Sequence, residues 1–598
     1  MDVNAGIPDA NAPTYGEGAT PKGKHANPDL KTPGKPQYAV DITAFQQRWS
    51  ALRTEGLSKW YPIWKDISRF ILPKRGFFEG MLPNWGTRID HKTVMSSAPM
   101  NAINTTASGM QSGLSNPAQP WFKLESENED DNGDQGVREW FEKVVKLLMD
   151  AFQASNVYPA LYTMYEECCA FGTHCFLVLP DPKTVIRCRV FTAGEYFIGC
   201  GPDGRPNALA RQFWMTAQQL VKEFGYNNCS SQVQNEYRDN AVDCWHLVYH
   251  LIEENDDRLI NFKDFRNMLY RSAYWEANVQ GGTKIALALR GFEERPFVAP
   301  RWELLTTASA YGSGRGWHAL GDVKQLYKMI KLYLMALAKV VDPPMVADAG
   351  AEVNTIPGGL SRSSANVQAG VKPAYQIQPD LPAMVQAIGA LKNDIATTLY
   401  ATFFLMLAQQ EGAMTATEVA ERHNEKMLML GPVINRLQAE AHDPLIERTF
   451  AILMRGKALP PIPARLAGKK IRIKYVSMLA QAQEMASAAF IEQFMQFLGN
   501  VSAVNPAALD NVNFDELVQI YGQKYSIPAK ILNNPDLVAQ LHAARAKQQA
   551  SAAQVQEMQA QAQMAQVLSQ TKVGDGNALE ALTGGGPGVG APPPGGVA

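Results

Sequence analysis

The chain has 598 residues, of which 58 are acidic and 56 are lysine or arginine, so its net charge is only −2. This balance argues against a free-standing basic nucleic-acid-binding protein, whose domain pI typically exceeds about 9. Charged residues make up 19% of the chain, below the roughly 25% of ordinary soluble domains. We therefore expect much of the surface to be covered, for example by further copies of the chain.

The cysteines and the apolar runs restrict where the protein is made. The seven cysteines lie between Cys168 and Cys244 without a C-x-x-C pair, which fits buried thiols in a reducing compartment better than a disulfide framework. Residues 1–38 lack the apolar core of a secretory signal. No apolar run reaches the roughly 18 residues that a membrane-spanning helix needs. The sequence predicts a soluble, intracellularly made protein of about four domains.

Both ends of the chain are predicted to be disordered. Residues 1–40 and 571–598 are rich in glycine and proline and lack periodic apolar patterns, so they cannot bury enough apolar surface to offset chain entropy. Between them, helical periodicity predicts helices within 41–71 and 137–151. The acidic stretch Glu125–Asp134, just before the second of these, is expected to be a solvated loop.

The pattern then becomes strand-like. Residues 173–302 hold short β-branched and aromatic runs bounded by Gly, Pro and Asp, which predicts a β-rich region. The runs expected to form strands are 173–179, 185–191 and 245–252.

Long helices are predicted after this region. The first, Gly321–Val341, ends at Asp342-Pro343-Pro344, because proline cannot continue a helix. A Gly/Pro/Ser-rich insert follows, and a second helix with an apolar stripe begins near Leu381. A polar break at 409–412 comes before Thr415-x-x-Glu418, which matches the capping box of a third helix.

Further helices are predicted toward the C-terminus. Gly431-Pro432 should kink or split the third helix. After a basic, Pro-rich link at 460–472, helices resume and end in an Ala/Gln-rich helix from about Pro535 to Gln570. Its small residues permit close packing in a bundle or tube of copies. A partly disordered tail is the alternative.

The sequence contains none of the common signatures of catalysis. Gly281-Gly282-Thr283-Lys284 has the wrong order for a phosphate-binding loop, and neither H-E-x-x-H nor G-x-S-x-G occurs. Gly312, Gly314 and Gly316 alternate without forming G-x-G-x-x-G, so we expect a flexible turn there. We predict no catalytic residue and no cofactor.

Three residues have the types found in metal sites. Cys244, His246 and His250 lie close together in the sequence, but alternate residues on a strand share a face, so these side chains are expected to pack beside Val248. They also lack the second closely spaced cysteine pair of a structural zinc site. We predict no bound metal.

Lysines form a stripe on the first long helix. Lys324, Lys328, Lys331 and Lys339 fall within roughly 80° of one another at 100° per residue. On a single copy this pattern is that of an ordinary solvated helix face. In a ring of copies, the same stripe would place rings of positive charge around a central hole. Lysine contacts phosphates without reading bases, which suits a duplex that slides past.

Several short motifs follow one another along the chain. They are Pro120-Trp121-Phe122, Phe171-Gly172-Thr173, Tyr311-Gly312-Ser313-Gly314-Arg315-Gly316, Asp342-Pro343-Pro344, Met414-Thr415-Ala416-Thr417-Glu418-Val419 with Arg422, Leu430-Gly431-Pro432-Val433 with Arg436-Leu437, and Pro444-Leu445-Ile446. In this order they resemble the portal, or head-to-tail connector, proteins of short-tailed, podovirus-like bacteriophages, over roughly residues 41–545.

This resemblance implies a portal fold that is α+β and mainly helical, assembled as a dodecameric ring at one capsid vertex. It implies these segments: a disordered N-terminal segment 1–40, a wing 41–320, stem helices 321–341 and 381–407, a clip 342–380, a tunnel loop 408–416, wing helices 417–475, a crown or short helical barrel 476–570, and a disordered tail 571–598. The implied tunnel-loop residues are Gln409, Gln410, Glu411 and Gly412. The implied DNA-channel residues are Lys324, Lys328, Lys331 and Lys339.

The resemblance also implies partners and a place of action. Double-stranded DNA passes non-specifically through the ring during packaging and ejection, and the terminase large subunit and tail adaptor proteins dock at the clip. Capsid and scaffolding proteins are further partners, and no membrane is involved. The protein would be assembled in the host cytoplasm and reside in the virion.

Two other functions are compatible with the sequence. The first is a minor capsid or adaptor protein that assembles through helices without conducting DNA. The second is an enzyme whose site is unrecognised, in the β-rich residues 173–302.

Overall fold

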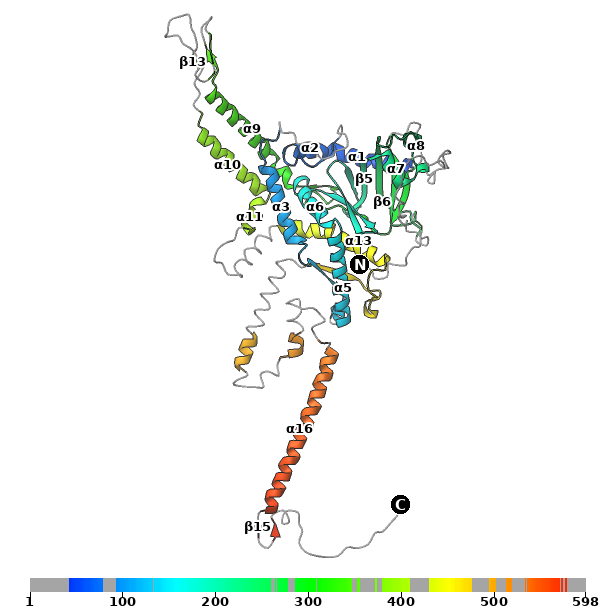
Figure 1. Ribbon diagram of the computed structural model, residues 1–598, viewed down its shortest axis with the longest axis vertical. Coiled ribbons are helices and arrows are strands. Elements are labelled where there is room, and N and C mark those ends of the chain that lie inside the picture. The colour runs from blue at the N-terminus through cyan, green and yellow to red at the C-terminus, as the bar shows by residue number, and fades with distance from the viewer. Residues whose placement is uncertain are drawn as a thin grey trace. The chain divides into compact units, whose positions relative to one another are not determined.

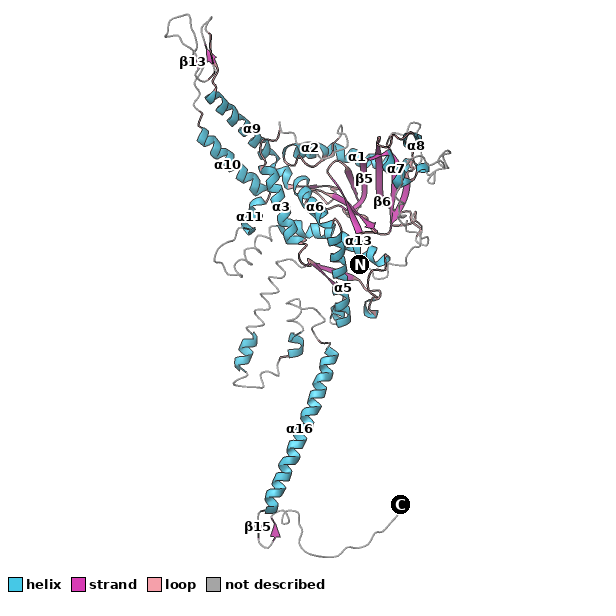
Figure 2. Cartoon of the chain, in the orientation of Figure 1, coloured by secondary structure: helices cyan, strands magenta, loops and turns pink. Residues whose placement is uncertain are grey.

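The computed structural model describes residues 42–78, 93–132, 134–259, 264, 266–277, 286–307, 309–346, 352–354, 356, 372–373, 379–408, 430–475, 494–501, 512–518, 533, 535–570, 572–573 and 576–577. The chain divides into two compact units. The larger comprises Met1–Asn132 and Gly136–Gln483, and the smaller Gly133–Gln135 and Glu484–Ala598. Helices predominate and strands are fewer (Figure 2), which confirms the α+β, mainly helical prediction.

The elements before residue 484 alternate between helical and β-rich stretches. The helices are α1 (Thr43–Lys59), α2 (Tyr61–Phe70), α3 (Ala98–Leu114), α4 (Glu129–Asn132), α5 (Gln135–Ala154), α6 (Val157–Phe171), α7 (Ala217–Phe224), α8 (Ser231–Arg238), α9 (Arg315–Val341), α10 (Leu381–Thr398), α11 (Ala401–Ala408) and α13 (Asp443–Arg455). The strands are β1 (Phe122–Ser126), β2 (Cys175–Asp181), β3 (Val185–Phe191), β4 (Tyr196–Cys200), β5 (Pro206–Thr216), β6 (Trp245–Glu254), β7 (Tyr270–Glu276), β8 (Ala288–Phe292), β9 (Phe297–Val298), β10 (Glu303–Leu304), β11 (Gly312–Ser313), β12 (Met345–Val346), β13 (Lys372–Pro373) and β14 (Ile471–Tyr475).

The β-rich region between residues 173 and 302 is confirmed as an antiparallel five-stranded sheet, β4-β5-β6-β7-β8, beside a three-stranded sheet, β3-β2-β9. Successive side chains along each strand point to opposite faces of the sheet. Other elements of the fold cover both faces of the larger sheet. On one face α1 packs against Ala208 and Ala210 of β5, with Trp49 donating from its ring nitrogen to the Arg211 carbonyl at 3.2 Å. On the other face Leu209 joins a core with α2 and α6 (Figure 1).

The acidic stretch 125–134 is not the solvated loop that we expected. Its first residues belong to β1, which pairs antiparallel with β14, and α4 follows. Asp131 is buried and its carboxylate lies 2.6 Å from the ammonium of Lys469. The ammonium of Lys474 on β14 lies 3.2 Å from the carboxylate of Glu125. Two carboxylates of the acidic stretch therefore pair with lysines in and just after the basic link 460–472, which is distant in sequence.

The first long helix begins earlier than predicted. α9 starts at Arg315 rather than Gly321, because Gly314 is still extended and the next residues already form helical turns. It ends at Val341, before the two prolines, as predicted. α9 and α10 run side by side (Figure 1). The apolar stripe predicted for the second helix is the buried side of α10, with Ile388 and Ile395 inside.

The second long helix is broken, whereas the sequence predicted one helix over 381–407. α10 ends at Thr398 and α11 begins at Ala401. Tyr400, between them, has a φ of 62°, which is left-handed and cannot continue a right-handed helix. The predicted tunnel-loop residues Gln409, Gln410, Glu411 and Gly412 lie outside the described residues. So do the predicted capping box, Gly281–Lys284 and both predicted disordered ends, apart from short strands at 572–573 and 576–577.

The smaller unit contains the predicted Ala/Gln-rich helix, α16 (Pro535–Gln570), followed by the paired strands β15 (Lys572–Val573) and β16 (Gly576–Asn577). The predicted bounds of this helix are confirmed. Among all described residues, no helix combines the length and the apolarity needed to cross a membrane.

Candidate functional site: the α9–α10 pair and the junction at its base

The lysine stripe of α9 lies on the helix face that does not enter the core. Lys324, Lys328, Lys331 and Lys339 are all exposed. The core-facing side of the first half of α9 holds other residues, namely Ala319, Val323, Leu326 and Tyr327. This half packs against α2, α6 and α10, and the Tyr327 hydroxyl donates to the Phe70 carbonyl at 2.8 Å. The fold therefore fixes which way the stripe faces relative to α2, α6 and α10.

Lys324 contacts α2. Its ammonium lies 2.6 Å from a carboxylate oxygen of Asp66 and 5.1 Å from the ring centre of Phe70. These contacts fasten α9 to α2 and offset the positive charge. Surface pairs of this kind contribute roughly 0–1 kcal/mol to stability.

The second half of α9 leaves the core and carries large apolar side chains at the surface. They are Leu332, Leu334, Met335, Leu337, Val340 and Val341. Val385 on α10 is also exposed, with 52% of its surface accessible. Exposed apolar residues that gather on one element usually mark a surface that another molecule covers.

At the base of α9, glycines let two backbones touch. Gly172 ends α6 with a φ of 87°, and a Cβ at this position would lie 2.2 Å from the Gly312 carbonyl oxygen. The Gly312 amide donates to the Thr173 hydroxyl at 2.8 Å. Gly314 is equally close, because its added Cβ would lie 2.5 Å from the Gly172 nitrogen. The flexible turn that we expected at 312–316 is instead β11 and the tightly packed first turn of α9.

Trp302 is the centre of this junction. It is fully buried, and its amide donates to the Gly172 carbonyl at 2.8 Å. Its own carbonyl accepts from the Arg436 guanidinium at 3.0 Å, and its ring stacks on Tyr400 with centres 6.4 Å apart. The Arg315 guanidinium also contacts Tyr400, at 4.5 Å from the centre of its ring. Burial raises the pKa of the Tyr400 phenol, and Arg315 opposes this shift.

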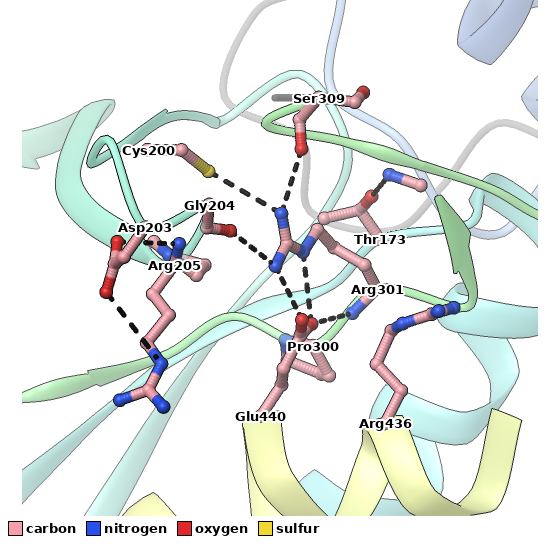
Figure 3. A network of polar contacts seen from close by, with 12 residues as sticks. Thr173, Cys200, Asp203, Gly204, Arg205, Pro300, Arg301, Ser309, Arg436 and Glu440 are labelled. Carbon is pink, nitrogen blue, oxygen red and sulfur yellow. Dashed lines mark hydrogen bonds and ion pairs between the residues drawn. The ribbon is translucent and has the colours of Figure 1, made fainter. Parts of the chain in front are cut away.

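The neighbouring residue, Arg301, is buried and forms an ion pair with the partly buried Glu440. Figure 3 shows its guanidinium against the Glu440 carboxylate, with Nη2 at 2.5 Å from one oxygen and Nε at 3.1 Å from the other. The Arg301 amide adds a third hydrogen bond to Glu440 at 2.9 Å. Two of the remaining guanidinium hydrogens reach the carbonyls of Ser309 and Gly204, at 2.8 and 2.9 Å, and the third reaches the Cys200 sulfur at 3.6 Å. Such charge-assisted, bidentate pairs are the strong kind of hydrogen bond.

Glu440 reaches Arg301 from an irregular helix. Residues 430–437 are α-helical, Gln438–His442 form a π-helix, and α13 continues from Asp443. π-Helical turns inside α-helices occur frequently at functional sites. Nothing in the sequence singled out Arg301, Tyr400 or Glu440, because they belong to no motif and come from segments far apart in the chain.

The histidines weighed as metal ligands have other partners. The His246 ring pairs with the Glu236 carboxylate at 2.5 Å. His250 is buried, accepts from the Arg211 guanidinium at 2.8 Å and lies 2.8 Å from the Ser272 hydroxyl. Burial, together with nearby Arg211, holds the pKa of His250 well below its usual range. Among the described residues, no group of three or more His, Cys, Asp or Glu side chains is placed to hold a metal ion.

A comparison with protein families identifies the chain. Residues 43–532 match the family model described as "Bacteriophage head to tail connecting protein". The chain belongs to this family of head-to-tail connecting proteins. It is 36% identical over 543 residues to the "Probable portal protein" of Bordetella phage BPP-1, covering 90% of this chain and 97% of the relative. It is 35% identical over 525 residues to the "Portal protein" of Salmonella phage epsilon15, covering 87% and 94%.

A solved structure also aligns with the chain. It is described as "Virion of native gene transfer agent (GTA) particle", at 11% identity and a TM-score of 0.32, covering 76% of this chain and 98% of that one. These values are too low to establish a shared fold.

Three of the motifs by which the chain resembles connector proteins meet at the junction. Phe171-Gly172-Thr173 contacts Tyr311–Gly316 directly, through the glycine backbones. Arg436, from the motif after Leu430, contacts Trp302. Motifs that are scattered along the sequence of this connector protein are therefore neighbours in space.

Proposed function

We propose that copies of this connector chain form a closed ring at one capsid vertex and that double-stranded DNA passes through the ring during packaging and ejection. The observation that carries this proposal is the exposed lysine stripe of α9, opposite the helix face that packs on the core. The stripe would line the channel with Lys328, Lys331 and Lys339, while Asp66 offsets the charge of Lys324.

The electrostatics of such a stripe suit a duplex that must move. Lysine binds phosphates as a point charge, without sequence readout and with strong dependence on salt. Met335 is exposed and lies on the lysine face of α9, between Lys331 and Lys339. The row of positive charges along this face is therefore interrupted by an apolar side chain. Each contact would be weak enough for DNA to slide past.

The exposed apolar side chains support assembly of copies. Apart from Met335 on the lysine face, those on the second half of α9 and on α10 would be covered by the same helices of neighbouring copies. α16 also exposes its large apolar side chains, namely Leu537, Leu541, Val555, Met558, Met564 and Val567. Copies of α16 would cover them in a helical barrel. A ring of twelve copies is the assembly that the resemblance to portal proteins implies.

Each segment of the chain would form a different part of the ring. Residues 41–320 and 417–475 would form the wing, 321–341 and 381–407 the stem helices, and 476–570 the crown. The clip at 342–380 would dock the terminase large subunit and later the tail adaptor proteins, and capsid and scaffolding proteins would contact the ring. The tunnel loop at 408–416, with Gly412 as hinge, would grip or release DNA. The terminase would supply the energy, so that the chain itself catalyses no reaction.

The test reverses two lysines of the stripe. We expect Lys328→Glu with Lys331→Glu to leave rings with a central hole in electron micrographs. Packaged or retained DNA in phage complemented by this variant should fall by about tenfold or more, because every copy then repels the duplex. Lys183→Glu with Lys222→Glu, two exposed residues outside α9, is the charge-matched control.

The outcomes separate the candidate functions. Unchanged packaging with intact rings would remove the channel role of the stripe. Filaments or monomers of the wild-type protein in micrographs would favour a minor capsid or adaptor protein that does not conduct DNA. Hydrolase, nuclease or ATPase activity of the purified chain would favour an enzyme.

A further inference from the structure

α11 leaves the α9–α10 pair through a strained residue whose conformation several contacts enforce. A tyrosine with a left-handed φ, 62° at Tyr400, is uncommon and persists only where its surroundings over-determine it. The Thr106 hydroxyl donates to the Leu399 carbonyl at 2.5 Å. The Tyr400 ring contacts both the Arg315 guanidinium and the Trp302 ring. The direction in which α11 sets out is therefore fixed by side chains from α3, from α9 and from the segment around Trp302.

The helix at 430–437 is attached to the same two residues of the junction. Arg436 donates to the Trp302 carbonyl, and Glu440, one turn later, receives three hydrogen bonds from Arg301. The Arg301 side chain is only 3% exposed and that of Glu440 16%. Because Arg301 is almost fully buried, removing the Glu440 carboxylate would leave the guanidinium charge without compensation, which is strongly destabilising.

We infer that Arg301 and Trp302 are positioning residues that couple α11 to the helix at 430–437. These two helices are the described segments on either side of residues 409–429. Trp302 contacts the first through Tyr400 and the second through Arg436, while Arg301 holds the second through Glu440. Since Arg315 also contacts Tyr400, the first turn of α9 belongs to the same network of contacts. A disturbance at either helix would then reach the other, and the coupling is reciprocal.

The test is amide hydrogen exchange on the full-length chain. We expect Glu440→Gln to speed exchange in α11 by at least tenfold, although Glu440 forms no hydrogen bond or ion pair with α11 among those described. The matched control is Glu293→Gln, which breaks an exposed pair with Arg455 at 3.3 Å; it should leave α11 unchanged. α8, which packs at the far end of the five-stranded sheet, is the internal reference.

A second pair of variants tests the coupling from the other side. Tyr400→Ala removes the contacts with Trp302 and Arg315 and should speed exchange at 430–437 by a similar factor. Tyr400→Phe keeps the ring and should behave like the wild type. Because Tyr400 is partly exposed, these variants serve even if Glu440→Gln does not fold.

Two results would overturn the inference. One is faster exchange confined to the helix that carries the substitution. The other is equal acceleration in α8, which would indicate a general loss of stability. What the coupling does to DNA in a ring rests on the proposed function, whereas exchange in the purified chain does not. A failure of the coupling and a failure of the channel proposal are therefore distinguishable.

Discussion

Gly172 occupies a position that only glycine fits. Its φ of 87° is left-handed, and the atoms nearest to an added Cβ belong to the backbone of residues 312–314. A backbone that is part of a strand and a helix start cannot move aside as a flexible side chain can. The close approach of α6 to the base of α9 therefore depends on the absence of one methyl group.

We expect Gly172→Ala to lower the free energy of unfolding by roughly 2–4 kcal/mol, since unfavourable φ and backbone overlap both act. Gly321→Ala is the control, because an added Cβ there has nothing within 4 Å. It should raise stability by about 0.5–1 kcal/mol through helix propensity. Urea unfolding followed by tryptophan fluorescence measures both variants. Similar midpoints for the two would contradict the contact.

His442 is a residue whose charge state depends on burial. It is completely enclosed in the π-helix, with its Nε2 2.9 Å from the Tyr165 hydroxyl and its ring 5.2 Å from that of Trp121. Asp443 follows it, and the Tyr475 ring lies 5.9 Å away. Burial lowers the pKa of His442 to about 4, because the charged ring would lose its hydration.

This shift predicts a pH dependence with a definite sign. The unfolded histidine has a pKa near 6.5, so it takes up a proton before the folded one does. The contribution of neutral His442 to the free energy of unfolding is complete above about pH 6.5 and is lost as the pH falls toward 4. Relative to His442→Gln, the wild type should lose about 3 kcal/mol over this range. Urea midpoints measured at each pH test this, and parallel profiles would contradict it.

Among the described elements, α16 stands out because none of its described side chains is buried. Its 36 residues present large apolar side chains to solvent, and in proteins most helical stability comes from packing rather than propensity. The described residues of a single copy give this helix little packing. The helix should therefore be stable only where copies meet.

We expect the amides of α16 to exchange at least tenfold more slowly in assembled particles than in dilute, unassembled chains. α5, whose apolar face is buried within one copy, should exchange at the same rate in both. Hydrogen exchange at two protein concentrations, with assembly checked by light scattering, measures this. Equal protection of α16 in both states would show that it needs no partner.

The elements that the sequence predicted well carry their signal locally. α5, α9 and α16 have long amphipathic or Ala-rich patterns, and the strands β2, β3 and β6 have β-branched runs bounded by turns. β14 was missed because its sequence, Ile-Arg-Ile-Lys-Tyr, lies in a basic, Pro-rich stretch whose acidic counterpart is far away. The sequence alone predicts a solvated loop for the acidic stretch and a link for the basic one, because the ion pairs between them form only in the fold.

The junction could be predicted only in part. The glycines of 171–173 and 311–316 drew attention as motifs, but their meeting depends on the fold. The break at Tyr400 has no proline or glycine to announce it, since contacts from Thr106, Arg315 and Trp302 impose it. Arg301 and Glu440 are 139 residues apart and become partners only when the chain is folded.

At the scale of the whole molecule, the low content of charged residues is matched by exposed apolar side chains that gather on particular elements. Many of the apolar side chains left at the described surface lie on the second half of α9, around β12 and on α16. The lysine stripe shares α9 with them. In the proposed ring, the apolar surfaces would contact neighbouring copies over large areas. The narrow lysine stripe would contact the DNA phosphates.

The pairing of β1 with β14 sets the order in which the larger unit can be completed. Roughly 350 residues separate the two strands, so a ribosome working at about 5–20 residues per second needs about 20–70 s to supply the second after the first. During that time the edge of β1 has no partner, and unpaired edges invite association with other chains. Slower synthesis therefore lengthens the time during which this edge is open to association with other chains.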